Sequence, residues 1–218
     1  MKTIIIGAHG KVALLLSREL SARGDVVTGV VRNAGHAAEV EATGAKALVF
    51  DVEHAPTEAI ADALAGHDAV IWSAGAGGGN PERTYAVDRD AAVRTVNAAE
   101  SAGVRRFVMV SFAHADVGQL VPLDDPFYPY QTAKIAADDH LRASALDWTI
   151  LGPGRLTDSP ASGNVGTAEP ERGAPSDTSR ANVARVAAEV LANESTFGRT
   201  LNFVDGDVPI LDWLTRPA

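Results

Sequence analysis

Tyr130 and Lys134 stand four residues apart in the stretch PYQTAKIAADDHL, a spacing that can support proton chemistry. Residues at i and i+4 of a helix lie on the same face, one turn apart. An ammonium group beside a phenol lowers the pKa of the phenol from its ordinary value near 10, so that it can serve as an acid or a base. The spacing therefore predicts proton transfer by Tyr130, although such a pair also arises by chance.

Ser111 is a second residue of chemical interest, at the end of the apolar run in VMVSFAH. This run predicts a central strand, and open α/β sheets bind their ligands beyond the carboxyl ends of such strands. The hydroxyl of Ser111 could hold a substrate oxygen there. A strand-end serine that bonds only to nearby backbone explains the residue equally well.

A glycine-rich turn lies near the start of the chain, in IIIGAHGKVA. Gly7 permits a sharp turn between a strand and a helix, Gly10 lets a diphosphate approach the backbone, and Ala13 lets the helix pack closely. The first turn of the helix offers free N–H groups and a positive dipole end to phosphates. Glycines also end strands for structural reasons alone, but this is the first strand, where such sheets bind dinucleotides. The expected phosphate contacts are Gly7, His9, Gly10, Lys11 and Val12.

Arg32 follows the second apolar run, in GVVRNAGH. Sites specific for NAD carry a carboxylate about 20 residues beyond the glycines, which accepts from the ribose 2′-hydroxyl. Here the position holds a guanidinium, which would bind a 2′-phosphate through charge-assisted hydrogen bonds. Arg32 therefore favours NADP(H) over NAD(H), and the alternative is an ordinary surface arginine.

Further cofactor contacts are expected after the third and fourth apolar runs. Asp51 and Val52 of FDVEH could meet the adenine, whereas Asp51 could instead cap the helix that begins near Pro56. The residues after the fourth run are small enough for a cofactor to pass against the chain, although the glycines at 77–79 could form a simple turn. These small residues are Ser73, Ala74 and Gly75.

Apolar runs of strand length alternate with alanine-rich segments of helical period along the chain, which predicts a doubly wound Rossmann fold with a mostly parallel sheet and helices on both faces. The expected strands are 3–6, 26–31, 47–49, 69–72, 107–110, 149–151 and 200–204. The expected helices are 12–23, 36–42, 56–64, 84–102, 133–143, 180–192 and 210–214. The length suits one domain, residues 1–218, in which about 152–180 and the C-terminal segment form a small substrate or lid region.

Composition excludes several classes of protein. A net charge of −9 argues against binding to nucleic acid or to an anionic membrane, and the absence of cysteine excludes disulfides and thiolate metal sites. The start MKTIII is too short for a signal peptide, and no apolar run approaches the length of a membrane span. The histidines are dispersed, so no metal site is expected, and neither G-x-S-x-G nor a P-loop is present. A soluble cytoplasmic protein is expected.

Most of the chain resembles the atypical NAD(P)-binding, epimerase-like group of the short-chain dehydrogenase/reductase superfamily. The matching segments are IIGAHGKVA, VVRN, DVE, WSAGAGG, DRDAAVRTVNAAESAGVRRFVMVSF, YQTAKIAADDHLRASALDWTILGPGRLTD and DTSRANVARVAAEVLAN. The resemblance implies that Ser111 polarises a carbonyl, that Tyr130 exchanges its proton, and that Lys134 holds the nicotinamide ribose and tunes Tyr130. It also places Asp88 where many members of the superfamily carry a catalytic asparagine, and Pro153 at the nicotinamide end.

Two departures from the family pattern are visible. Asp88 offers only acceptors when ionised, so it cannot replace the donors of an asparagine and could be structural. Gly152 stands where the family usually carries an arginine before Pro-Gly.

The function expected from these features is an NADP(H)-dependent oxidoreductase or epimerase-like enzyme that acts on a small carbonyl or alcohol. A non-catalytic NADP(H)-binding redox sensor and an NAD(P)H-dependent flavin or quinone reductase remain alternatives. The substrate is expected between the strand ends and residues 157–180, against an apolar surface, and the protein is expected to be a monomer or a homodimer. This surface would comprise Phe112, Phe127, Tyr128 and Leu156.

Overall fold

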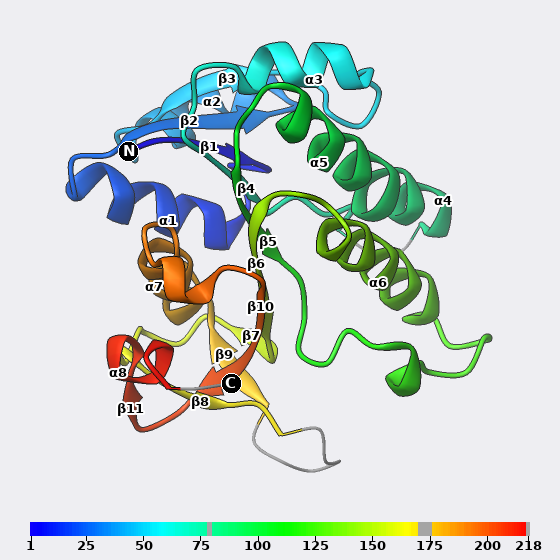
Figure 1. Cartoon of the computed structure of the whole chain (residues 1–218), viewed down its shortest axis with the longest axis vertical. Coiled ribbons are helices and arrows are strands. Elements are labelled where there is room, and N and C mark those ends of the chain that lie inside the picture. The colour runs from blue at the N-terminus through cyan, green and yellow to red at the C-terminus, as the bar shows by residue number, and fades with distance from the viewer. Residues whose placement is uncertain (78–79, 170–175, 217–218) are drawn as a thin grey trace.

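The computed structural model describes residues 1–77, 80–169 and 176–216, and within them a nine-stranded sheet forms the centre of the molecule (Figure 1). Its strands lie in the order β11-β8-β10-β6-β5-β4-β1-β2-β3. Their bounds are β1 (Lys2–Ile6), β2 (Val26–Val31), β3 (Lys46–Val49), β4 (Ala69–Trp72), β5 (Arg106–Val110), β6 (Asp147–Pro153), β8 (Asn164–Thr167), β10 (Arg199–Asp205) and β11 (Val208–Pro209).

The seven strands from β3 to β10 are parallel, and β8 and β11 complete the other edge with antiparallel pairing. The chain moves outward from β1 through β2 to β3, and then returns to place β4 on the other side of β1. Such a reversal leaves a crevice beyond the carboxyl ends of β1 and β4, where open α/β sheets bind their ligands. The predicted doubly wound α/β fold is confirmed.

Helices cover both faces of the sheet (Figure 1). The side chains of Ile4 and Ile6 enter a core shared with α3, α5 and α6, whereas Ile5 enters a core shared with α1 and α7. Each strand is therefore buried on both faces, which explains why the sequence reads as continuous apolar runs. The helices are α1 (Lys11–Ala22), α2 (Ala37–Glu41), α3 (Thr57–Leu64), α4 (Pro81–Thr84), α5 (Ala92–Ser101), α6 (Tyr128–Arg142), α7 (Arg180–Val190) and α8 (Ile210–Leu214).

Two helices differ from the predicted ones in ways that affect the site. The helix expected over 84–102 begins at Pro81, and residues Tyr85–Ala91 between α4 and α5 wind as a π-helix. The helix expected over 133–143 begins five residues earlier, so that Tyr130 and Lys134 both lie on α6. Proline is tolerated in the first turn because its missing N–H has no helical partner there, and Pro129 occupies that turn.

The segment between β6 and α7, which the sequence assigns to a substrate or lid region, contains three strands in its described part and is called the excursion after β6. It contributes β8 to the main sheet, and β7 (Arg155–Thr157) pairs with β9 (Asp177–Ser179) in a small parallel sheet of its own. Residues 170–175 of this excursion, and Gly78 and Gly79 of the expected glycine turn, lie outside the described residues. In the described part of the chain, no helix has the length and apolar character needed to cross a bilayer.

Candidate functional site

Two adjoining cavities lie beyond the carboxyl ends of β1, β4 and β5. The larger holds about 710 Å³ and the smaller about 370 Å³, and both are bordered by Gly10, Ser73, Ala74 and Gly75. The larger cavity extends toward α6 and the smaller toward the end of β2. Because they share these four residues, the cavities form one groove across the point where the strand order reverses, which is where open α/β sheets bind dinucleotides.

The glycine turn forms the floor between the two cavities. Gly7 has a φ of +83°, and a Cβ at this position would lie 2.5 Å from the Cα of Ala74. The N–H of Gly10 donates to the carbonyl of Gly7 at 3.0 Å, and the carbonyl of Gly10 accepts from Leu14 to begin α1. No described side chain caps the N-terminus of α1, so its first N–H groups remain available to an anion. This end of the groove fits a diphosphate.

Two cations flank the same helix terminus and share one carboxylate. The Nζ of Lys11 lies 2.7 Å from one oxygen of Asp158, and Arg180 lies 2.7 Å from the other. The hydrogen bond from Lys11, with the charge of Arg180, lowers the pKa of Asp158. Lys11 and Arg180 both border the larger cavity. Asp158, in the excursion after β6, therefore lies beside the predicted phosphate site and occupies both cations.

The smaller cavity gathers the residues predicted for the adenosine end, including Arg32, Asp51 and Val52. Arg32 donates to Glu53 at 2.6 Å, a pairing that sequence patterns did not reveal because it links two strand ends through the fold. Asp51 accepts from His54 at 2.9 Å and from the backbone of Glu53, and it does not cap α3. The capping alternative for Asp51 is therefore wrong.

His9 also borders the smaller cavity, where its ring stacks on that of His36. The ring centroids are 3.6 Å apart and the planes differ by 9°. This contact joins the glycine turn to the segment after β2. The segment predicted to bind the diphosphate and the segment predicted to bind the 2′-phosphate therefore form one wall of the smaller cavity.

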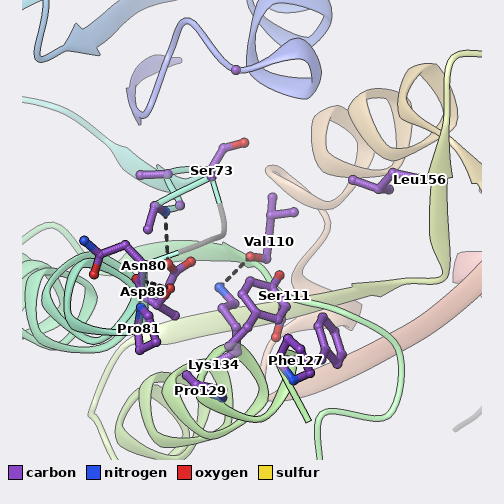
Figure 2. Close-up of a pocket in the computed structure, with 18 of the residues that line it drawn as sticks. Ser73, Asn80, Pro81, Asp88, Val110, Ser111, Phe127, Pro129, Lys134 and Leu156 are labelled. Atoms are coloured by element: carbon purple, nitrogen blue, oxygen red, sulfur yellow. Dashed lines mark hydrogen bonds between the residues drawn. The ribbon is translucent and has the colours of Figure 1, made fainter.

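Lys134 is the buried cation of the larger cavity (Figure 2). Its Nζ donates to the carbonyl of Val110 at 2.8 Å. Burial lowers the pKa of Lys134, and the charges of Asp138 and Asp88 act in the opposite direction. The Nζ also donates to Sδ of Met109 at 3.7 Å, so the ammonium group is held at the end of β5 with one N–H left for a ligand.

Ser111 borders the same cavity, one residue beyond the carbonyl that Lys134 binds. Its Oγ lies 2.5 Å from Oδ2 of Asp138, a short hydrogen bond in which the hydroxyl can donate to a carboxylate or accept from a carboxylic acid. The alternative of a serine bonded only to backbone is therefore wrong.

Tyr130 also borders the larger cavity, and its ring packs against two aromatic rings. The centroid distances are 5.7 Å to Phe112 and 5.1 Å to Phe127. Burial raises the pKa of Tyr130, and the negative charges of Asp88 and Asp138 raise it further. The ammonium of Lys134 binds the Val110 carbonyl, and the negative charges of Asp88 and Asp138 act against the lowering of the Tyr130 pKa that the sequence predicts.

Asp88 projects from the π-helical segment into the larger cavity (Figure 2). Its Oδ2 accepts from the N–H of Ala76 at 3.0 Å. Burial raises the pKa of Asp88, although the Ala76 hydrogen bond and the charge of Lys134 favour the ionised form. Asp88 thus fixes the loop after β4, which is the structural role that the sequence left open, and it also borders the cavity.

Asp138 was not singled out from the sequence, although it lies four residues after Lys134 and hence on the same face of α6. Its side chain is completely buried, and its Oδ1 receives no hydrogen bond from the described residues. Burial raises the pKa of Asp138, and Lys134 and Ser111 oppose that rise. The Lys134–Asp138 spacing was the available signal, but surface ion pairs commonly show the same spacing.

Some residues expected at the nicotinamide end lie elsewhere. Pro153 is buried in β6, where its carbonyl accepts from Ala113, and it borders neither cavity. A side chain at Gly152 would collide with Asn202 of β10, which occupies the space that an arginine would need. The amide of Asn202 accounts for this departure from the family pattern.

The apolar wall of the larger cavity differs from the predicted one. Phe127 and Leu156 border the cavity as expected, whereas Phe112 and Tyr128 do not, and Leu123 joins the wall. Across the described ranges 1–77, 80–169 and 176–216, no three His, Cys, Asp or Glu side chains are grouped to hold a metal ion.

Comparison with known proteins agrees with this geometry. The model of a family described as NAD(P)H-binding matches residues 7–194. The protein named "Uncharacterized sugar epimerase YhfK" of Bacillus subtilis is 36% identical over 99% of this chain and 100% of its own length. The UPF0659 protein YMR090W of Saccharomyces cerevisiae is 34% identical over 96% of each chain.

Solved structures give the same result. A Bacillus halodurans protein provisionally assigned as an NAD-dependent epimerase/dehydratase has a TM-score of 0.89 and 33% identity over 98% of each chain. The oxidoreductase ylbE of Lactococcus lactis has a TM-score of 0.86 and 29% identity, over 98% of this chain and 95% of its own. The chain therefore belongs to the NAD(P)H-binding family, an oxidoreductase- and epimerase-like group of atypical short-chain dehydrogenases/reductases.

Proposed function

We propose that this protein is an NADP(H)-dependent oxidoreductase that reduces a carbonyl group on a small substrate with an apolar body. One observation carries the proposal: Ser111, Lys134 and Tyr130 border the same cavity that reaches the open N-terminus of α1. A nucleotide held by its diphosphate at α1 would direct its other end toward these three side chains. When bound, the nicotinamide would supply or accept a hydride at its C4.

The groups that border the two cavities have separate roles in this proposal. The first N–H groups of α1 bind the diphosphate. Arg32 releases its hydrogen bond to Glu53 and binds the 2′-phosphate instead. The remaining N–H group of Lys134 holds the nicotinamide ribose. Ser111 orients the substrate oxygen, and Tyr130, whose raised pKa keeps the phenol protonated, lies beside that oxygen.

The substrate class follows from the rim of the larger cavity. The side chains of Leu123 and Phe127 are 79% and 45% exposed, and neighbouring exposed apolar side chains at a cavity rim can mark a ligand-binding surface. Both border the cavity, together with Leu156. A substrate with an aromatic or aliphatic body would cover this rim while its carbonyl reaches Ser111.

The sensor and the flavin or quinone reductase remain alternatives, and Tyr130→Phe separates them from the proposed enzyme. Slower turnover with unchanged NADPH affinity supports the enzyme. Unchanged reduction of a free flavin in the variant favours hydride transfer to a ring without help from the phenol. Tight NADPH binding with no turnover of a carbonyl panel in the wild-type protein favours the sensor.

Calorimetric titration with NADPH and NADH tests the cofactor assignment. We expect the wild-type protein to prefer NADPH by at least about 10-fold, and Arg32→Ala to weaken NADPH binding by about 10- to 100-fold, since a hydrogen bond to a charged group contributes roughly 1.5–3 kcal/mol. NADH binding should change little. Arg18→Ala removes the same charge from an exposed position of α1 and is the control. Equal wild-type affinity for the two nucleotides would contradict the assignment.

Asp158→Asn should strengthen NADPH binding, because Lys11 and Arg180 are then free to meet the diphosphate. The gain is expected to be about 2- to 5-fold at low ionic strength, since exposed ion pairs contribute at most about 1 kcal/mol. It should shrink in 0.5 M salt because exposed charges are screened. Asp62→Asn, an exposed position on α3, is the matched control. A weaker affinity in Asp158→Asn would show that the carboxylate assists binding.

A further inference from the structure

The proton source of the site is a separate question, and it concerns a buried group of three charged residues. Asp88 and Asp138 lie near Lys134, and all three side chains are almost completely buried. Two carboxylates and one ammonium would leave a net negative charge in the interior, at a high cost in solvation energy. Binding one proton removes that charge.

The hydrogen bonds indicate which carboxyl group takes the proton. Asp88 accepts from the backbone N–H of Ala76, a donor that favours a carboxylate. Asp138 meets the hydroxyl of Ser111, which can donate to a carboxylate or accept from a carboxylic acid. The other oxygen of Asp138 has no hydrogen-bond partner among the described residues, so no second hydrogen bond stabilises a negative charge there.

Other charged groups act on Asp138 from its own helix. Lys134 lies one turn before it, Arg142 lies one turn after it, and Asp139 lies beside it. Arg142 is paired with Asp139 at 2.7 Å, so its charge is largely balanced. Burial, which raises the pKa of Asp138, is opposed mainly by Lys134 and by the Ser111 hydroxyl.

We propose that Asp138 is the proton store of the site and that its proton reaches the substrate oxygen through the hydroxyl of Ser111. Ser111 borders the cavity, whereas Asp138 lies behind it, and their 2.5 Å hydrogen bond is the link between the two. Ser111 is the residue that touches the substrate, and Asp138 acts through it. The proposal rests on the reductase function proposed above.

The proton and electron balance of this step is complete. The carbonyl carbon accepts a hydride from the dihydronicotinamide, and the carbonyl π electrons move to oxygen. That oxygen takes the proton of Ser111, and Ser111 takes the proton of Asp138. Asp138 is left as a carboxylate beside Lys134 and regains a proton from solvent after the product leaves.

Tyr130 is the less effective acid in this arrangement. Its pKa is raised above its ordinary value by burial and by the two carboxyl groups. Proton donors work best when their pKa lies near the working pH, and burial moves the pKa of the Asp138 carboxyl group toward that range but moves the pKa of the Tyr130 phenol away from it. The proposal therefore gives Tyr130 a role in orienting the substrate oxygen and assigns the proton to Asp138.

The protonation of Asp138 can be tested without turnover. We expect the infrared spectrum at neutral pH to contain a carboxylic acid C=O band that shifts in deuterium oxide and disappears in Asp138→Asn. The band should persist in Asp88→Asn and in Asp139→Asn, which removes a neighbouring exposed carboxylate. Absence of the band from the wild-type protein, or its loss only in Asp88→Asn, would overturn the proposal.

Turnover of 9,10-phenanthrenequinone with NADPH tests the transfer itself. Asp138→Asn keeps the size of the side chain and is expected to lower kcat by about 10²- to 10⁴-fold, with an NADPH dissociation constant within 2-fold of wild type. The wild-type kcat should fall as pH rises, because Asp138 loses its proton. The pH–rate profile of Asp138→Asn should lack this decrease. Asp139→Asn should behave as wild type.

The outcomes separate this proposal from the function on which it rests. A wild-type protein that binds NADPH and reduces the quinone, with an Asp138→Asn variant that matches it in rate and pH profile, overturns only the role of Asp138. A wild-type protein that neither binds NADPH nor reduces the quinone overturns the reductase function, and the proton-transfer role falls with it.

Discussion

Gly7→Ala is expected to weaken NADPH binding by about 100-fold, or roughly 3 kcal/mol, and to destabilise the protein as well. A left-handed residue with a side chain costs about 1–2 kcal/mol. The new methyl group would also lie within 3 Å of the Ala74 backbone, and overpacking of this kind costs a further 1–3 kcal/mol. To relieve this clash, the loop after β4 and the turn before α1 must move apart. This movement displaces the N–H groups that face the diphosphate.

Gly24→Ala is the matched control for this experiment. Gly24 has a φ of +88°, close to the +83° of Gly7, but a Cβ there would have no neighbour within 4 Å. It should therefore show the backbone cost alone, with unchanged NADPH affinity. Thermal unfolding and calorimetric titration measure the two effects. Equal losses of stability and equal affinities in the two variants would contradict a close approach at Gly7.

Lys134→Met is expected to reduce the free energy of unfolding by about 3–5 kcal/mol near pH 8 and to abolish turnover. The variant keeps the length of the side chain but leaves Asp88 and Asp138 buried without their cation, and breaking a buried charge pair costs this much. Chemical denaturation measures the loss, and 9,10-phenanthrenequinone with NADPH measures turnover.

The same variant has a defined pH dependence. Without Lys134, the pKa values of Asp88 and Asp138 rise further, so between the unfolded value near 4 and the raised values the folded state binds more protons than the unfolded state. Stability therefore falls as pH rises, and the deficit relative to wild type should be smaller at pH 5 than at pH 8. Lys46→Met, at an exposed position on β3, should stay within about 0.5 kcal/mol of wild type. A deficit that does not change with pH would contradict the charge argument.

The sequence was sufficient for the features that depend on local patterns. The apolar runs located the strands from β1 to β6, and the glycine spacing located the turn between β1 and α1. The place of Arg32 after β2 was sufficient to expect it beside the smaller cavity, because the last residues of parallel strands meet at one edge of a sheet. These predictions depended only on the pattern of residues within a short stretch of chain and on the strands being parallel.

Features that depend on contacts between distant segments could not be predicted. The pairing of Arg32 with Glu53 requires the relative positions of β2 and β3, and the space filled by Asn202 requires β10 beside β6. Asp138 looked like one of several acidic residues on a helix until its burial against Ser111 was known. A single sequence gives the type of such a side chain but not its surroundings.

The π-helical segment Tyr85–Ala91 has a consequence for the tolerance of this site to changes in chain length. A π-helical turn accommodates an extra residue relative to an α-helix, and such insertions are often kept where they direct a functional side chain. Deleting one residue from this segment would allow α4 and α5 to join as an uninterrupted helix. Asp88 would then rotate by about 100° around the axis, and the Ala76 amide would lose its acceptor. The segment is therefore expected to accept replacement of its exposed side chains more readily than a deletion.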